Sequence, residues 1–241
     1  MDVRDGFIVG IFNYCDRWCE ACAFTSRCRL FADVAETEAS LDPNLKAVVD
    51  APVLPQEAPP PPPPWMGEMI REMNEAATKV AVEDDEPVRR PPPKEHLAIE
   101  ARAKDYCFRA HRWLRTRSYA ALDPGDPSAV IGWFETMIPA KVHRAIHGLA
   151  EDWPEDRDCV SDHDGSAKVA LIGIERSHAA WLALIERGIA AHGDVAPLIE
   201  DLVWLSDAVE RVFPKARAFV RPGLDEPDEV AMLLIRERRR S

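Results

Sequence analysis

Six consecutive prolines, Pro59 to Pro64, constrain the fold of this 241-residue chain more than any other feature. Proline lacks a backbone N–H and fixes φ, so a run of this length cannot join a helix or a central strand and favours an extended polyproline II conformation. A second stiff stretch follows at Pro91 to Pro93. We therefore expect residues 42–93 to be a proline-rich linker, with one short helix at 66–82, between two folded parts.

The chain after the linker has the apolar spacing of helices. Apolar residues recur there at intervals of three and four, and no strand pattern competes with them. Four helices are predicted, at 94–118, 127–151, 165–191 and 195–213. The sequence thus predicts an all-α protein with a domain resembling a four-helix bundle at residues 94–221, followed by a polar tail, 222–241, that can hold one short helix.

The first part, residues 1–41, contains a dense group of cysteines. Cys15, Cys19, Cys22 and Cys28 follow the pattern C-x3-C-x2-C-x5-C. Thiolates repel one another, so the grouping is explained by a cation or an iron–sulfur core that neutralises them. We expect a metal-binding module with these four cysteines as ligands, in which the run 16–38 is helical because it lacks glycine and proline.

The sequence spacing of the cysteines indicates which of two metal centres, zinc or an iron–sulfur cluster, they bind. Zinc is usually held by two C-x2-C pairs far apart in sequence, and here only Cys19 and Cys22 form such a pair. A [4Fe–4S] cluster accepts thiolates from a short, wrapped segment. The sequence therefore favours a [4Fe–4S] cluster, with Zn²⁺ as the alternative. A third interpretation is that the four cysteines are buried thiols without a metal. The charged residues between them disfavour it.

The segment from Cys19 to Cys28 is similar to the C-x2-C-x5-C end of the [4Fe–4S] motif in WhiB-like regulators and in RecB-type nucleases with iron–sulfur staples. The resemblance implies cluster ligation but neither fold nor activity, because the Gly-Val-Trp-Gly-Gly turn of the WhiB-like family and the acidic nuclease motif are missing. The first three cysteines also match the spacing of radical SAM enzymes, although Ala21 stands where those enzymes commonly have an aromatic residue. Residues 14–31 resemble the start of an uncharacterised class of bacterial proteins, which implies no function.

Other residues have the spacing of a helix-bundle metal site. Glu175 and His178 form one Glu-x-x-His pair, and neighbouring predicted helices carry Glu100, Glu135, His143 and His147. A di-iron bundle needs two such pairs. We therefore expect His178 to be a buried histidine that hydrogen-bonds Glu175. His143 and His147 are four residues apart and either bind a metal together or lie on a solvated face.

The net charge and the chemistry of a fully ligated cluster limit the classes of function that this chain can have. The net charge of −12 disfavours nucleic acid and anionic membranes as partners. The apolar run Phe7 to Phe12 is too short for a signal peptide or a membrane span, so we expect a cytoplasmic protein. A fully ligated cluster has no open position for a substrate. The sequence predicts a metal-binding interaction or redox-regulatory protein whose helical domain binds another protein; the alternative is an enzyme or electron-transfer component with a cofactor or second metal in the bundle.

Overall fold

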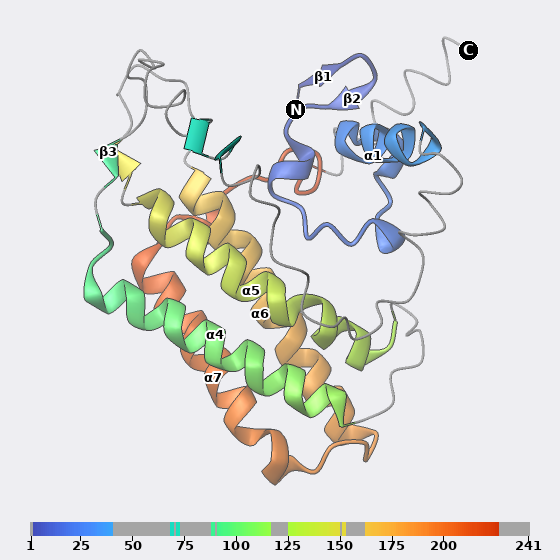
Figure 1. Ribbon diagram of the computed structural model, residues 1–241. Coiled ribbons are helices and arrows are strands. Elements are labelled where there is room, and N and C mark those ends of the chain that lie inside the picture. Colours follow the sequence, from blue (N-terminus) through green and yellow to red (C-terminus); the bar gives the residue numbers. More distant parts are fainter. Residues whose placement is uncertain are drawn as a thin grey trace.

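The computed structural model describes residues 2–40, 68–69, 71–72, 88–89, 91–116, 125–149, 151–152 and 162–226. Its larger part consists of four long helices, α4 (Lys94–Arg115), α5 (Pro127–Leu149), α6 (Asp162–Glu186) and α7 (His192–Val212), which pack side by side (Figure 1). Each end lies within five residues of the position expected from apolar spacing. The predicted all-α class is confirmed.

The core lies between these four helices, and α5 packs most extensively on α6. Gly173 of α6 permits this close approach, because a Cβ at that position would lie only 2.9 Å from the ring of Phe134 and 3.2 Å from Ile138. Trp181 and Tyr106 are fully buried, and the indole Nε1–H of Trp181 donates to the hydroxyl of Tyr106 at 3.2 Å. The bundle therefore has a complete core of its own.

The N-terminal module is less regular than expected. It begins with a hairpin of β1 (Val3–Arg4) and β2 (Phe7–Ile8), followed by the 3₁₀ turns η1 (Ile11–Asn13), η2 (Cys19–Ala21) and η3 (Thr25–Arg27) and by the helix α1 (Arg29–Ser40). The expected helix over 16–38 is thus wrong in its first half. Arg17 has φ of +55°, a left-handed conformation that interrupts a right-handed helix. The chain therefore folds back on itself around the cysteines before α1 begins.

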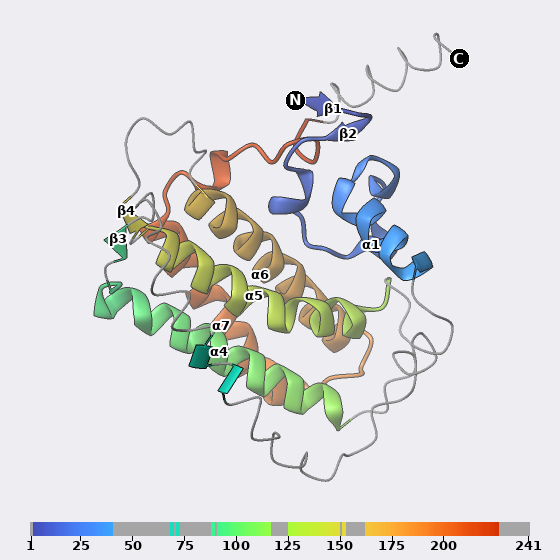
Figure 2. The same cartoon turned by 45° about the horizontal axis from the view of Figure 1, so that its top comes forward.

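The module lies against one side of the bundle, beside α5 and α6 (Figure 2). A segment after α7, which includes the 3₁₀ turn η4 (Ala216–Ala218), runs back toward it. The ring of Phe219 meets Tyr14 edge-on with 4.8 Å between centroids, and Gly223 packs on the side chain of Ile8. Residues 222–226, expected to belong to the polar tail, therefore connect the module to the bundle.

Little of the expected linker is described. Residues 68–69 and 71–72 are helical, as predicted for part of 66–82. The strand β3 (Val88–Arg89) pairs antiparallel with β4 (Glu151–Asp152), so the end of the linker contacts the bundle. The rest of 42–90 and the short helix expected in the tail lie outside the described residues. None of the helices in the described part is long and apolar enough to span a lipid bilayer.

Candidate metal centre

Short backbone turns position the four cysteines. Cys15 follows η1, and Cys19 is the first residue of η2. Cys22 and Cys28 are the residues that end η2 and η3, and both have extended backbone angles. Each 3₁₀ turn therefore directs the chain out of a helical path at a cysteine, which a continuous helix from residue 16 would not do.

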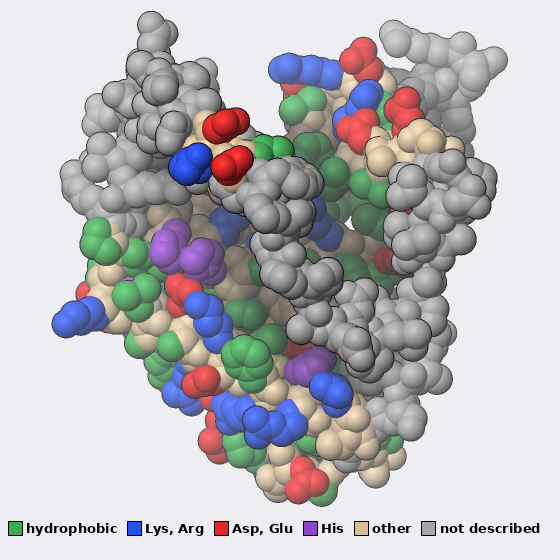
Figure 3. All heavy atoms as spheres, viewed as in Figure 1, with side chains coloured by type: hydrophobic (Ala, Val, Ile, Leu, Met, Phe, Trp, Pro, Cys, Tyr) green, Lys and Arg blue, Asp and Glu red, His purple; other side chains and the backbone are tan. Residues whose placement is uncertain are grey.

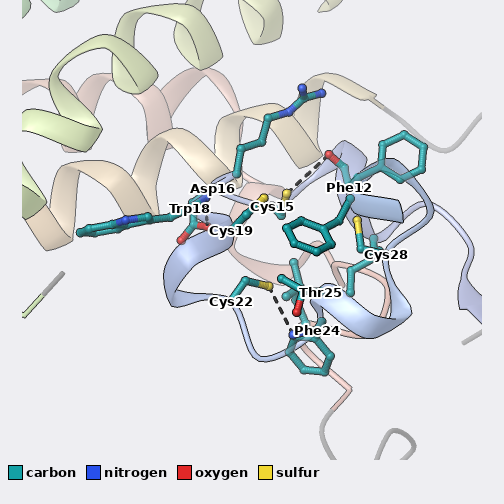
Figure 4. A pocket seen from close by; sticks show the side chains of 13 residues that line it. Phe12, Cys15, Asp16, Trp18, Cys19, Cys22, Phe24, Thr25 and Cys28 are labelled. Atoms are coloured by element: carbon teal, nitrogen blue, oxygen red, sulfur yellow. Dashed lines mark hydrogen bonds between the residues drawn. The ribbon is translucent and has the colours of Figure 1, made fainter. Parts of the chain in front are cut away.

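All four cysteines line one cavity. Figure 4 shows the four cysteines around one pocket, with an aromatic ring drawn among their sulfur atoms and with Trp18 directed away toward the helices. The other walls are mainly apolar and include Ile11, Phe12, Phe24, Phe31 and Leu224. The cysteines are free and partly buried. Apolar walls of this kind limit water access to the sulfurs, which is one way in which a protein tunes a metal centre.

Zinc and a cubane cluster require different distances between the sulfurs that bind them. Thiolates around one tetrahedral zinc lie about 2.3 Å from the ion and hence roughly 3.8 Å from one another. Over the residues that the structure describes, no three of the four cysteine sulfurs lie all within 4.8 Å of one another. A cubane presents its irons at separate corners, so its thiolates stand further apart than those of a single ion. In the described structure the four sulfurs therefore line the cavity without closing around the position of a single ion.

Hydrogen bonds and burial set the protonation of the sulfurs. The backbone N–H of Phe24 donates to Sγ of Cys22 at 3.4 Å, and the thiol of Cys15 donates to the carbonyl of Phe12 at 3.6 Å. Burial, with neighbouring negative charge, raises the pKa of the Cys15 thiol, and burial with the other cysteines raises the pKa of Cys19. A bound cation favours the thiolate and reverses both shifts.

The loop between the first two cysteines makes several contacts with the bundle. The backbone carbonyl of Asp16 accepts a hydrogen bond from Nε1–H of Trp133 in α5 at 2.8 Å, and its carboxylate pairs with Arg176 of α6 at 2.6 Å. The ring of Trp18 stacks on Trp133 with 5.4 Å between centroids and 13° between planes. The same short loop therefore carries the flanking cysteines and holds the module on the helices.

Further contacts surround this loop. Lys141 of α5, only 8% exposed, donates to the carbonyl of Asn13 at 3.3 Å. Burial and nearby arginines lower the pKa of Lys141. Tyr14 packs directly on Gly165 of α6, where there is no side chain to keep it away. These contacts could not be predicted from the sequence, because each joins residues more than a hundred positions apart.

The residues of the expected di-iron pattern do not meet at one site. Glu175 is half exposed and pairs with Arg217 at 2.6 Å, and in the described part of the chain no hydrogen bond joins it to His178. The expected Glu175–His178 bond is therefore wrong: a guanidinium gives the carboxylate a charge-assisted bond that an imidazole one turn away does not match. His178 is partly buried and lines a groove between α6 and α7.

The remaining acids of that pattern form two separate groups between α4 and α5. Glu135 pairs with His111 at 2.7 Å. Glu100 lies beside both His143 and His147. The spacing of the two histidines indicated that they share a face, but their approach to Glu100 depends on how α4 crosses α5, which the sequence does not reveal.

Comparison with known proteins finds no match: no family model fits the sequence, and no curated protein or solved structure is significantly similar to the chain.

Proposed function

We propose that this protein is a metal-binding interaction or redox-regulatory protein, with a [4Fe–4S] cluster on Cys15, Cys19, Cys22 and Cys28, and with Zn²⁺ as the alternative metal. The observation that carries the proposal is that the four sulfurs line one cavity while the loop between two of them contacts the bundle. The state of the metal centre is thereby linked to the docking of the module.

The donor set supports a cluster. Four thiolates can ligate every corner of a cubane, which leaves electron transfer, sensing or structural support as its chemistry. The apolar walls and the N–H donated to Cys22 fit such a group, since hydrogen bonds to sulfur and solvent exclusion both tune its potential. When bound, the cluster supplies one-electron redox chemistry.

In this proposal, regulation acts through the docking of the cysteine module on the bundle. Cys15 and Cys19, as ligands, would fix the path of the chain between them, and release of either would free that loop. That loop carries the stacked Trp18 and the carbonyl and carboxylate of Asp16, so the same change weakens three contacts with α5 and α6. The module then separates from the bundle, and the surfaces of both parts become accessible.

The proposed partner is another protein. The helix α1 buries none of its residues, and its Phe31 and Val34 side chains are 39% and 47% exposed. Exposed apolar side chains on an amphipathic helix are a common feature of helix-mediated protein binding. The net charge of −12 continues to disfavour nucleic acid.

The alternative of an enzyme with a cofactor near Glu175 and His178 gains no support from the contacts there. Glu175 is engaged by Arg217, which in turn binds Glu210. This arrangement stabilises the turn after α7 and leaves Glu175 half exposed. The enzyme alternative stays a prediction from sequence.

Anaerobic purification followed by an absorption spectrum and iron and sulfide analysis tests the proposal. We expect a broad band near about 400 nm and about four irons per chain, as iron–thiolate charge transfer in a [4Fe–4S] cluster requires. The variant Cys19→Ser/Cys22→Ser should lose both. Cys107→Ser, which changes a partly buried cysteine of α4, is the matched control and should keep them. Equal metal content in wild type and double variant would refute a shared site, and a colourless zinc protein would remove the redox role.

A further inference from the structure

A second group of metal-binding side chains lies where α4 crosses α5, on helices rather than in the cysteine module. Glu100 of α4 is only 6% exposed. Its Oε1 lies 3.0 Å from Nδ1 of His143, and its Oε2 lies 3.4 Å from Nε2 of His147. The two imidazole rings, one helical turn apart on α5, have centroids 4.1 Å apart. Figure 3 shows histidine side chains together on this face, over the carboxyl-terminal half of α5.

The carboxylate of Glu100 is only half satisfied. Its Oε1 accepts hydrogen bonds from Nζ of Lys104 at 2.5 Å and from His143 at 3.0 Å. Its Oε2 is buried and has no hydrogen-bond partner within the described residues, since the approach of His147 lacks hydrogen-bond geometry. A buried carboxylate oxygen without a partner leaves a position that a water or an ion can fill. Among the described residues Oε2 of Glu135 and Oδ2 of Asp201 are in the same state, and what distinguishes Glu100 is the pair of histidines beside it.

Ligand atoms of the three residues lie near enough to one another to share one small cation. Nitrogen and oxygen ligands at about 2.0–2.1 Å from a tetrahedral zinc lie roughly 3.3 Å from one another. Oε1 of Glu100 lies 3.0 Å from His143 and Oε2 lies 3.4 Å from His147, so the two histidines approach different oxygens of one carboxylate. One ligand atom from each of the three residues lies within 4.8 Å of the others. Among the described residues this is the only group of histidine, cysteine and acidic side chains that meets this spacing.

We propose that Glu100, His143 and His147 bind a zinc ion, independently of the cysteine module. Two imidazoles and one carboxylate form a donor set that zinc accepts readily. Lys104 holds Oε1, the oxygen beside His143, and leaves Oε2 beside His147, as an outer-shell partner does in other metal sites. Three protein ligands leave a fourth position, and the histidine side chains are 52% and 42% exposed, so that position faces solvent and takes water.

A nearby pair of residues provides the matched control. His111 and Glu135 also join α4 to α5, with a buried carboxylate 2.7 Å from a half-exposed imidazole. Only one histidine approaches that carboxylate within the described part of the chain. The two groups therefore differ mainly in the number of nitrogen ligands.

Zinc titration of the full-length protein, with its cysteines intact and a competing chelator present, tests the proposal. Wild type should bind one zinc equivalent more than His143→Ala/His147→Ala, whose affinity at this site should fall by more than about 100-fold, because loss of outer-shell partners alone costs about 10–100-fold. His111→Ala should bind as wild type does. Equal stoichiometry in wild type and double variant would overturn the site, as would an equal loss in His111→Ala.

A measurement on the wild type does not depend on how the variants fold. Zinc should protect His143 and His147 from modification by diethyl pyrocarbonate, detected by mass spectrometry of the peptides, while His111 stays reactive. Absence of zinc-dependent protection would overturn the proposal. Because every cysteine is retained, failure here leaves the cluster proposal untouched, and loss of the cluster in Cys19→Ser/Cys22→Ser should leave the protection of the histidines unchanged.

Discussion

Gly165 shows how a single missing side chain positions the module. It lies in α6, and a Cβ built there would come within 2.8 Å of the ring of Phe219 and closer still to the ring of Tyr14. Both rings are large and packed against each other, so neither can move without loosening the contact between module and bundle. The glycine lets Tyr14 lie directly on the helix backbone.

We therefore predict that Gly165→Ala destabilises the protein by about 1–3 kcal/mol, as overpacking does in other cores. Alanine favours a helix over glycine by up to about 1 kcal/mol, so the clash must outweigh that gain. Gly193→Ala in α7, where a Cβ meets nothing within 4 Å, is the control and should be neutral or stabilising. Urea denaturation measures both. In a Tyr14→Ala background the cost of Gly165→Ala should shrink, and an unchanged cost would place the clash elsewhere.

At the scale of the element, the long helices were predictable and the cysteine segment was not. The apolar positions that predicted α4 are buried along it; they include Ile99, Ala103, Tyr106 and Ala110. Between residues 15 and 28 composition favoured a helix, but the left-handed Arg17 and the 3₁₀ turns follow from contacts with α5 and α6 that are distant in sequence. Local propensity does not contain that information.

The candidate metal sites could also be predicted only in part. The four cysteines could be grouped from spacing alone, because a short segment must bring them near one another. The pairing of Glu100 with His143 and His147 could not, because it depends on the register between α4 and α5. Glu175 was assigned to His178 because they are neighbours on α6, whereas Arg217 reaches it from beyond the end of α7.

An ion cluster attaches the segment after η4 to α6. Asp225 is largely buried and accepts hydrogen bonds from Arg221 at 2.8 Å, and it pairs with Lys168 of α6 at 2.7 Å. Lys168 also donates to the carbonyl of Phe219. Burial raises the pKa of Asp225, but the bonds from Arg221 and Lys168 outweigh burial and hold this pKa well below its usual range.

This lowered pKa predicts a pH dependence. A carboxylate whose pKa is lower in the folded than in the unfolded protein stabilises the fold above the unfolded pKa of about 3.9 and loses that contribution progressively as pH falls below it. Asp225→Asn should therefore cost about 1–3 kcal/mol at pH 7 and less at pH 3. Urea denaturation at both values checks this. Asp207→Asn, which removes the same charge from an exposed position, should cost little at either pH; a D225N cost that is equal at both values would contradict the assignment.

For the whole molecule, the two folded parts differ in what holds them together. The bundle has a continuous core contributed by all four long helices. Among the described residues of the module, the buried apolar side chains are Ile8, Ile11 and Tyr14. Segments of about 40 residues or fewer seldom fold without a metal, a disulfide or a partner. We therefore expect the module to depend on its proposed metal and on docking, and the bundle to depend on neither.

We predict that removing the metal unfolds the module and leaves the bundle folded. In Cys19→Ser/Cys22→Ser, or after chelation, amides of residues 2–40 should lose protection from hydrogen exchange, because both the ligation and the loop that contacts Trp133 and Arg176 are lost. Amides along the buried faces of α5 and α6 should keep their protection, since Phe134, Ile138 and Trp181 pack within the bundle itself. Hydrogen exchange read by mass spectrometry, with Cys107→Ser as control, distinguishes the two parts. A module that stays protected without metal would mean that docking alone folds it, and a bundle that opens with it would mean that the chain is one cooperative unit.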